Sequence, residues 1–114
     1  MKTNQLFFAV GVTTFVLLSN GALAAGSAEK GKTAFVTNGC WQCHGFVGQG
    51  GITGPKLAPE PKPQEFYAVF VRHSNGPMPP YSEKILSKQD LEDIHAYLLS
   101  IPKGADYKSI KLLN

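Results

Sequence analysis

The stretch Cys40-Trp41-Gln42-Cys43-His44 decides how this chain of 114 residues is organised. Its C-x-x-C-H spacing is that of a c-type haem attachment site. Two thiols separated by two residues can form thioethers with the two vinyl groups on one porphyrin edge, and the following imidazole is placed to bind the iron. A metal-bound imidazole normally donates its other ring N–H to an acceptor. The motif therefore predicts attachment at Cys40 and Cys43, iron ligation by His44, and an acceptor beside His44.

Three other roles of a C-x-x-C pair fit the rest of the chain less well. A redox-active dithiol calls for a preceding strand, whereas residues 27–38 have helical character and no strand-like alternation is evident. Structural zinc calls for four Cys or His ligands, and beyond the motif the chain offers only the distant His73 and His95. A structural disulfide would have to use the same two cysteines.

Residues 1–24 have the three parts of a secretory signal peptide. Lys2 gives the positive start, residues 6–18 are mainly apolar, and Ala22-Leu23-Ala24 has the small-residue pattern of a cleavage site. We expect cleavage near Ala24/Ala25 and a periplasmic protein, because bacterial c-type haem is attached outside the cytoplasm. An uncleaved membrane anchor is the alternative, although the apolar run is shorter than the ~20 residues that span a bilayer.

The rest of the chain is expected to form one small domain, residues 25–102, followed by a tail, residues 103–114. Small domains bury only ~60 to 65% of their surface and commonly need an extra constraint, which a covalent macrocycle would supply. Without Lys2 there are ten Lys and Arg against eight Asp and Glu, so the formal net charge is +2. The sequence shows no basic block or nucleic-acid-binding motif, and we expect no nucleic-acid partner.

Residues 27–38 are predicted to be helical. Ser27 is a suitable N-cap, and Asn38-Gly39 is a suitable stop. Gly31 and Phe35 share one face. A glycine inside a helix indicates close approach of another helix, because it costs up to about 1 kcal/mol against alanine.

Two further helices are predicted downstream. The first runs from residue 63 or 64 to His73, and its apolar face is expected to lie in the core; that face carries Phe66, Val69, Phe70 and His73. The second opens with the capping box Ser87-Lys88-Gln89-Asp90 and runs to about Ser100. Its apolar stripe consists of Leu91, Ile94, Tyr97, Leu98 and Ile101.

Contacts of the last helix can also be anticipated. Tyr97 and Leu98 are expected to meet Gly31 and Phe35 of the first helix. His95 lies off the stripe and is expected to face solvent.

The segment between His44 and the second helix is rich in glycine and proline and is predicted to be a loop, residues 45–63. It does not follow a strand and open a helix, so a phosphate-binding loop is not indicated. Glycines allow the backbone to pack closely against a flat ligand. Pro55 keeps its carbonyl oxygen and could accept the His44 proton, and Leu57 could then cover the ring.

Met78 lies in a second informative stretch, Ser74-Asn75-Gly76-Pro77-Met78-Pro79-Pro80-Tyr81. Prolines on both sides fix neighbouring φ angles and keep Met78 out of the helical region, so one thioether is presented from a rigid loop. Met1 would leave with the signal peptide, and Met78 would then be the only methionine. We predict axial ligation by Met78; His73, a lysine or an open sixth position are the alternatives.

Together these motifs resemble a class I monohaem cytochrome c of the small bacterial periplasmic type. The resemblance extends from about Ala28 to Pro102 and is carried by the Gly31/Phe35 helix, the C-x-x-C-H motif, Gly54-Pro55-x-Leu57, the Met78 loop and the helix bearing Tyr97. It implies an all-α cytochrome c fold in which three main helices and loops wrap around one covalently attached haem. It also implies His44/Met78 ligation and electron transfer.

The resemblance further implies redox partners. The Met78 loop, ending in Tyr81, is similar to that of cytochrome subunits of periplasmic dehydrogenases. The expected role is a carrier, not an enzyme, working between a dehydrogenase and a terminal oxidase or other acceptor, as a monomer or as a subunit of a hetero-complex. A peroxidase-like enzyme or a sensor in which Met78 dissociates is the alternative. Four lysines either steer an acidic partner or are ordinary solvated side chains: Lys56, Lys62, Lys84 and Lys88.

Overall fold

The computed structural model describes residues 26–113, which are helical and contain no strand. The helices are α1 (Ala28–Thr37), α2 (Trp41–His44), α3 (Gln64–His73) and α4 (Lys88–Ser100), followed by the short 3-10 helices η1 (Tyr107–Ser109) and η2 (Lys111–Leu113). The all-α prediction is confirmed. The expected signal peptide lies outside the described residues, and within residues 26–113 no helix is both long and apolar enough to cross a membrane.

Helix α1 has the ends that its sequence predicts. The Ser27 side chain accepts a hydrogen bond from the backbone N–H of Lys30 at 3.4 Å, and Asn38 is the C-cap. Gly39 follows with φ of 74°, a left-handed conformation that glycine adopts without strain. The chain can therefore turn sharply from α1 into the motif.

Helices α1 and α4 cross with their backbones in close contact. A Cβ atom at Gly31 would overlap the backbone carbonyl of Asp93, which explains the glycine. The carboxylate of Asp93 is buried and accepts a hydrogen bond from the backbone N–H of Ser27 at 2.7 Å. The predicted meeting of the two helices is seen where Phe35 packs against Tyr97, and Gly31 lies directly on the α4 backbone at Asp93 and Ile94.

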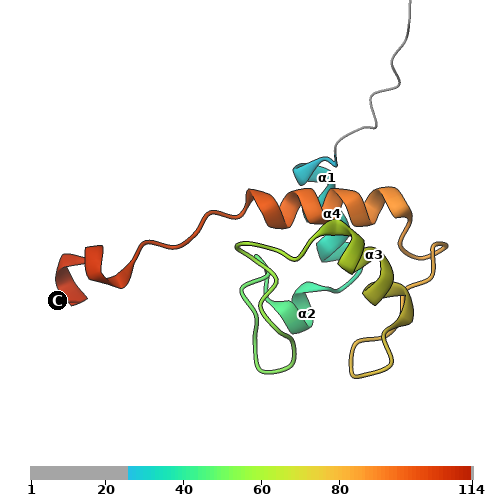
Figure 1. Ribbon diagram of the computed structural model, residues 1–114, viewed down its shortest axis with the longest axis horizontal. Coiled ribbons are helices and arrows are strands. Elements are labelled where there is room, and N and C mark those ends of the chain that lie inside the picture. Colours follow the sequence, from blue (N-terminus) through green and yellow to red (C-terminus); the bar gives the residue numbers. More distant parts are fainter. Residues whose placement is uncertain (1–25, 114) are drawn as a thin grey trace, which may run out of the picture.

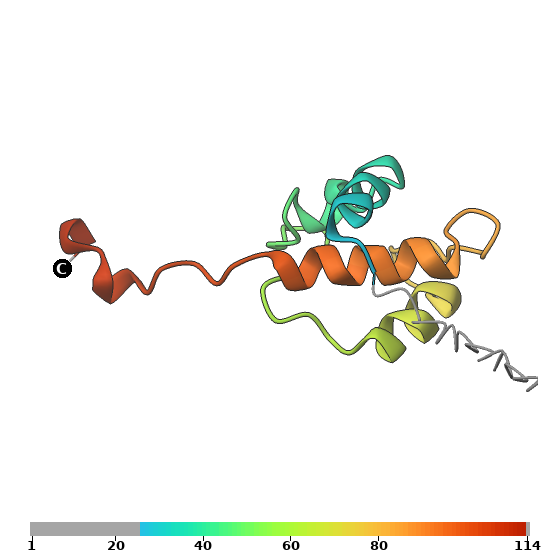
Figure 2. The ribbon, with the colours of Figure 1, turned by 90° about the horizontal axis from the view of Figure 1, so that it is seen from above.

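Helix α4 is the central element of the body. Both hydrogen bonds of the predicted capping box are present, since Ser87 Oγ accepts from the Asp90 N–H at 3.0 Å and Asp90 Oδ2 accepts from the Ser87 N–H at 3.1 Å. Figure 2 shows α1 on one side of α4 and α3 on the other. Four residues of the predicted stripe are buried, Leu91, Ile94, Tyr97 and Leu98, and Ile101 is partly buried. Tyr97 packs against Phe35 with ring centroids 5.7 Å apart. These contacts fix the frame to which the loops attach.

Helix α3 has the predicted bounds but a different buried face. Tyr67 and Val71 are its buried residues. The predicted core face was wrong: Val69 is 63% exposed, Phe66 and Phe70 are 47% and 46% exposed, and His73 is exposed. Phe66 and Phe70 stack on each other at 5.5 Å and line a cavity. Some apolar residues of α3 face the α4 core and others face that cavity. The 3.6-residue periodicity of the sequence predicts only a single apolar face, so it could not separate the two groups.

The chain leaves the helical body after α4. Figure 1 shows this last segment, drawn in red, extending away from the helices to η1 and η2. Lys103 Nζ lies 3.9 Å from Glu60 Oε1, between two largely exposed side chains. The division of the chain into a domain and a tail at residue 102 stays a prediction.

Candidate haem-binding site

The C-x-x-C-H motif forms a helix of its own, α2. The Cys40 N–H donates to the Phe35 carbonyl at 3.1 Å, which attaches the motif to the end of α1, and the His44 N–H donates to the Cys40 carbonyl at 3.0 Å. Gly45, with φ of 77°, ends the helix. Because residues three and four apart share a helix face, Cys40, Cys43 and His44 all line the same cavity.

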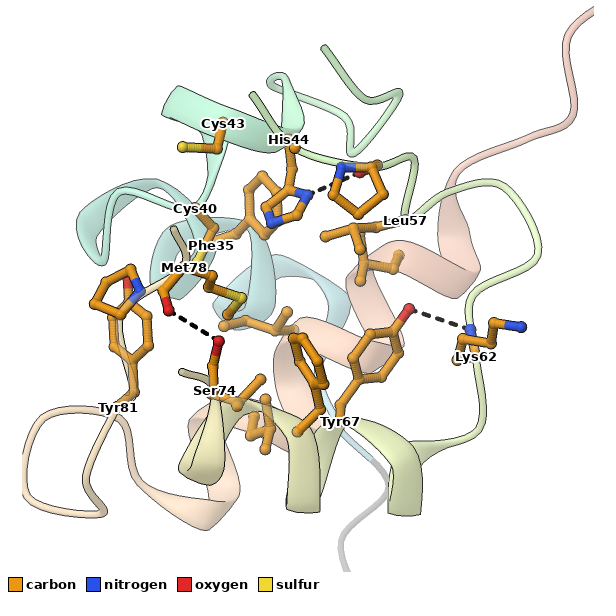
Figure 3. A pocket seen from close by; sticks show the side chains of 18 of the residues that line it. Phe35, Cys40, Cys43, His44, Leu57, Lys62, Tyr67, Ser74, Met78 and Tyr81 are labelled. Atoms are coloured by element: carbon orange, nitrogen blue, oxygen red, sulfur yellow. Dashed lines mark hydrogen bonds between the residues drawn. The ribbon is translucent and has the colours of Figure 1, made fainter. Parts of the chain in front are cut away.

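His44 is buried and held by one backbone acceptor. Its Nδ1 lies 2.8 Å from the carbonyl oxygen of Pro55, and Figure 3 shows the ring between that carbonyl and the cavity. A carbonyl oxygen can only accept, so Nδ1 donates and carries the proton. The lone pair of the neutral ring is therefore on Nε2, the nitrogen that a metal ion would bind.

Gly54 makes this contact possible. A Cβ atom at this position would lie 2.8 Å from the Cys43 carbonyl oxygen and 3.0 Å from His44 Nδ1. Both distances are shorter than ordinary van der Waals contacts, and neither the backbone nor the hydrogen-bonded ring can yield easily. Any side chain here would push the Pro55 segment away from His44.

A cavity of about 580 Å³ opens in front of His44. Its lining comes from every helix except η1 and η2 and from the two long loops, and it includes all seven residues that the sequence places at or around the site. They are Cys40, Cys43, His44, Pro55, Leu57, Met78 and Tyr81. A volume in this range accommodates a large cofactor.

Met78 reaches the cavity from a firmly attached loop. Its carbonyl oxygen accepts a hydrogen bond from the buried Ser74 hydroxyl at 2.8 Å. Three hydrogen bonds hold Tyr81. Its backbone N–H donates to the Val71 carbonyl at 2.9 Å, and its carbonyl accepts from Arg72 Nη1 at 2.8 Å. Its hydroxyl donates to the Asn38 carbonyl at 3.1 Å. Figure 3 shows the Met78 thioether pointing into the cavity.

The two thiols differ in environment. Cys43 is exposed, whereas Cys40 is partly buried, and burial raises the pKa of the Cys40 thiol from 9.0 to about 11. Neither forms a disulfide. Burial also raises the pKa of the Tyr81 hydroxyl, with a smaller contribution from the nearby thiols. The Cys40 thiol and the Tyr81 hydroxyl are therefore neutral at pH 7.

Three residues that the sequence did not assign to the site also line the cavity. The buried Tyr67 accepts a hydrogen bond from the Lys62 N–H at 3.1 Å, and the Lys62 carbonyl lies 2.9 Å from His95 Nε2. His95 was expected to face solvent but is only partly exposed. No local pattern links residues 62 and 95, so only the folded loop reveals this contact. Of the four lysines, Lys56 and Lys62 line the cavity, and Lys84 and Lys88 do not.

The residues present fit a covalently attached haem. One helix supplies two thiols that form no disulfide and an imidazole bonded through Nδ1 to the Pro55 carbonyl, a second segment supplies a thioether, and the remaining walls are largely apolar. Among residues 26–113 there is no group of three or more His, Cys, Asp or Glu side chains that could hold a metal ion without such a cofactor. The zinc alternative thus lacks a ligand set in the described part of the chain.

Comparison with known proteins defines the class. Residues 26–98 match the family described as "Cytochrome C oxidase, cbb3-type, subunit III", and the chain belongs to this family of c-type cytochromes. It is also 35% identical over 74 residues to the "Cytochrome bc1 complex cytochrome c subunit" of Corynebacterium diphtheriae, an alignment covering 62% of this chain. The chain spans about a quarter of that relative, 26% of its length. No solved structure matches.

Fold, site and family together make this chain a small c-type cytochrome, a haem protein of electron transfer.

Proposed function

We propose that the chain carries single electrons through one haem, held covalently by Cys40 and Cys43 and ligated by His44 and Met78. The observation that supports this most directly is the meeting of two segments in one cavity. One brings an imidazole whose tautomer is fixed by Pro55, and the other brings a thioether from a loop fixed by Ser74 and other contacts.

The cofactor would supply a one-electron couple between Fe(II) and Fe(III). The chain supplies its environment. The Pro55 carbonyl keeps the proton on Nδ1 of His44 and orients the ring. The Met78 thioether donates less electron density than an imidazole, so it favours the reduced state relative to a second imidazole. Leu57, Phe66 and Phe70 make the cavity walls apolar and limit the access of water.

Ligation on both sides distinguishes a carrier from an enzyme. With His44 and Met78 both bound, no metal position would remain for a substrate, so the chain would exchange electrons without making new bonds. The electron would enter and leave through the haem edge near exposed Cys43 and the Met78 loop.

We also propose that the protein works in the periplasm between two redox partners. Residues 1–24 would direct export to the periplasm and be removed there. The donor would be a dehydrogenase and the acceptor a terminal oxidase or a similar redox protein. The relative named as a subunit of the cytochrome bc1 complex supports membership of a hetero-complex as one form of this partnership.

The experiment that tests the ligand set compares wild type with Met78→Ala. Wild type should retain haem on a denaturing gel, and its oxidised spectrum should show low-spin iron with the weak far-red sulfur-to-iron band. Met78→Ala should keep the haem, lose the band and have a lower reduction potential. Val69→Ala, at an exposed position outside the cavity, should match wild type. High-spin wild-type iron, or an unchanged spectrum and potential in Met78→Ala, would contradict the assignment.

Export has a separate test. The intact mass of protein from a periplasmic extract should equal that of a chain beginning at Ala25 plus one haem. A mass that includes residues 1–24 would support the uncleaved anchor instead.

A further inference from the structure

The excess positive charge of this chain lies in one short segment after α4. Residues 25–102 contain seven Lys and Arg against seven Asp and Glu, so their formal charge is zero. Residues 103–113 have a formal charge of +2, and their charged side chains are Lys103, Asp106, Lys108 and Lys111. We call residues 103–113 the basic tail. An acidic surface would therefore attract this segment more strongly than it attracts the rest of the chain.

The basic tail also exposes apolar side chains. Leu112 is 95% exposed and Ile110 is 38% exposed. Figures 1 and 2 show, from two perpendicular directions, that the tail leads away from the helical body. The body therefore does not cover Leu112, and burying this side chain against another surface would remove apolar area from water.

The basic tail has local structure that displays these side chains. Asp106 caps η1: its Oδ1 accepts from the Lys108 N–H at 3.0 Å, and its carbonyl oxygen accepts from the Ser109 N–H at 2.8 Å. The next turn, η2, carries Lys111 and Leu112 as adjacent residues. A lysine and a leucine next to each other suit a surface on which acidic and apolar parts adjoin.

The start of the basic tail lies beside the cavity. Ile101 packs against the buried core, and Lys103 Nζ lies 3.9 Å from Glu60 Oε1. Glu60 in turn lines the cavity. Since a chain extends at most ~3.6 Å per residue, Leu112 lies at most about 40 Å from Ile101. A partner that held the tail would therefore stay within that distance of the body.

From these features we propose that the basic tail binds in a groove on the redox partner, with an apolar floor and a rim of Asp and Glu side chains. The proposal rests on the function proposed above. Leu112 would be buried on the floor of the groove, and Lys108 and Lys111 would pair with carboxylates of the rim. The Lys103–Glu60 pair is largely exposed on both sides and contributes little stability, so Lys103 can exchange Glu60 for a carboxylate of the partner.

A protein groove suits the basic tail better than a membrane surface does. A bilayer binds an amphipathic helix through a continuous apolar face. The helical parts of the tail, η1 and η2, are three residues each and do not form such a face. A concave protein site, by contrast, can enclose a single leucine and place a few polar groups around it.

Holding the basic tail would speed electron transfer without any contact to the haem. Once the tail is bound, the body and the partner meet at the effective concentration that a short linker sets, which reaches the millimolar range. The electron would still pass through the haem edge near Cys43. Loss of the tail contact should therefore weaken binding and leave the rate of electron transfer within the complex unchanged.

A zero-length crosslinker tests the predicted chemistry and identifies the partner in one experiment. A carbodiimide joins a lysine only to an Asp or Glu that it touches, and it is applied to an extract of the native host containing the haem-loaded full chain. We expect crosslinks from Lys108 or Lys111 to Asp or Glu residues of one redox protein. Crosslinks from lysines of the body alone, or none from the tail, would overturn the proposal.

The affinity for that partner is then measured with the purified proteins. Leu112→Ser should raise the Kd at least about tenfold, because a leucine side chain buried in the complex would be lost. Lys111→Glu should raise the Kd about tenfold at low salt and much less at 1 M salt, where the Debye length is ~3 Å. Val69→Ser and Lys32→Glu are the matched controls at exposed positions of the body, and both should bind like wild type.

Electron-transfer kinetics separate binding by the tail from effects on the haem. At partner concentrations well below the Kd, the second-order rate constant of Leu112→Ser should be about tenfold lower than that of wild type. At saturating partner the two rates should be equal. The absorption spectrum and reduction potential should also match, because Leu112 does not line the cavity. An equal fall in rate at saturation would place Leu112 in the electron-transfer contact itself and overturn the proposal.

Vesicles distinguish a membrane from a protein as the occupant. Wild type should sediment with vesicles of phosphatidylglycerol and phosphatidylcholine no more than Leu112→Ser does. Sedimentation that depends on Leu112 without any partner protein would make the bilayer the occupant and overturn the proposal. If the Met78 spectral signature is present while the tail variants bind the partner like wild type, only this inference fails; if the signature is absent, the proposed function fails first.

Discussion

The hydroxyl of Tyr81 donates a hydrogen bond to the backbone carbonyl of Asn38 at 3.1 Å, although the two residues are 43 positions apart. This bond joins the loop that carries Met78 to the turn that leads into Cys40. The two halves of the candidate site are therefore connected outside the cavity as well as through it.

Removing this bond should loosen the Met78 loop. Tyr81→Phe deletes one partly buried neutral hydrogen bond, worth about 1 kcal/mol, and leaves the Asn38 carbonyl without that donor. We expect the far-red sulfur-to-iron band to disappear at a lower temperature than in wild type, before global unfolding seen by circular dichroism.

Tyr67→Phe is the matched control for this prediction. It removes a comparable hydrogen bond, to the Lys62 N–H, on a different side of the cavity. Its far-red band should disappear together with global unfolding. Equal separation of the two transitions in both variants would show that the Tyr81 bond has no special role.

The crossing of α1 and α4 should tolerate no side chain at Gly31. A Cβ atom would overlap the Asp93 carbonyl, and the obstacle is backbone, which can yield only if the helices move apart. Gly31→Ala should lower the free energy of unfolding by at least about 2 kcal/mol in urea titrations. Gly104→Ala, where nothing lies within 4 Å of the added atom, should change it little. Equal stability of the two variants would refute the close crossing.

The buried carboxylate of Asp93 should stabilise the start of α1. It accepts from the Ser27 N–H at 2.7 Å and from Gln89 Nε2 at 3.0 Å. Asp93→Ala would leave both donors without this acceptor and should cost about 2–3 kcal/mol. Glu92→Ala removes a carboxylate that is partly exposed and lies 3.9 Å from the exposed Lys88 ammonium, and it should cost under about 1 kcal/mol. A similar loss of unfolding free energy in both variants, measured by urea unfolding, would argue against a stabilising hydrogen bond between the Ser27 N–H and the Asp93 carboxylate.

Alkaline pH should destabilise the fold. Burial raises the pKa of Tyr67 and of Tyr97 above the usual 10.0. Above pH 10 the unfolded chain loses these protons while the folded chain keeps them, so the free energy of unfolding falls as pH rises toward the folded-state pKa values. Below pH 10 both states keep the protons, and these two groups contribute no pH dependence.

Urea midpoints between pH 8 and pH 11 would measure this effect. Tyr97→Phe should be less stable than wild type at pH 8, because the hydrogen bond to Phe46 is lost, but its stability should fall less steeply above pH 10. Parallel profiles for the two proteins would exclude Tyr97 as a source of the alkaline loss.

Local signals in the sequence were sufficient for most helix bounds. The caps at Ser27 and Ser87 act within three or four residues, and both appear as predicted. Helix α2 was not anticipated, because four residues are too few to nucleate a helix alone and depend on the bond from Cys40 to Phe35. The position of Gly31 against Asp93 likewise depends on how two distant helices cross.

In the candidate site, too, local features were predictable from the sequence, whereas contacts between distant segments were not. The C-x-x-C-H motif and the prolines around Met78 identify residue types and local backbone shape, and the structure brings both segments to one cavity. Hydrophobic periodicity misassigned Val69 because a helix beside a cofactor cavity has two apolar directions. The contacts among Lys62, Tyr67 and His95 join three separate segments and have no local signature.

Gly54 has a consequence for how this chain can vary. The residue has no side chain and takes part in no chemistry, yet an added methyl group would strike both the attachment helix and the ring of His44. In a saturation mutagenesis screen scored by haem retention, Gly54 should therefore tolerate as few substitutions as the cysteines themselves. Haem retention by this cytochrome would then depend on the absence of a Cβ atom at residue 54 as strictly as on the presence of its reactive side chains.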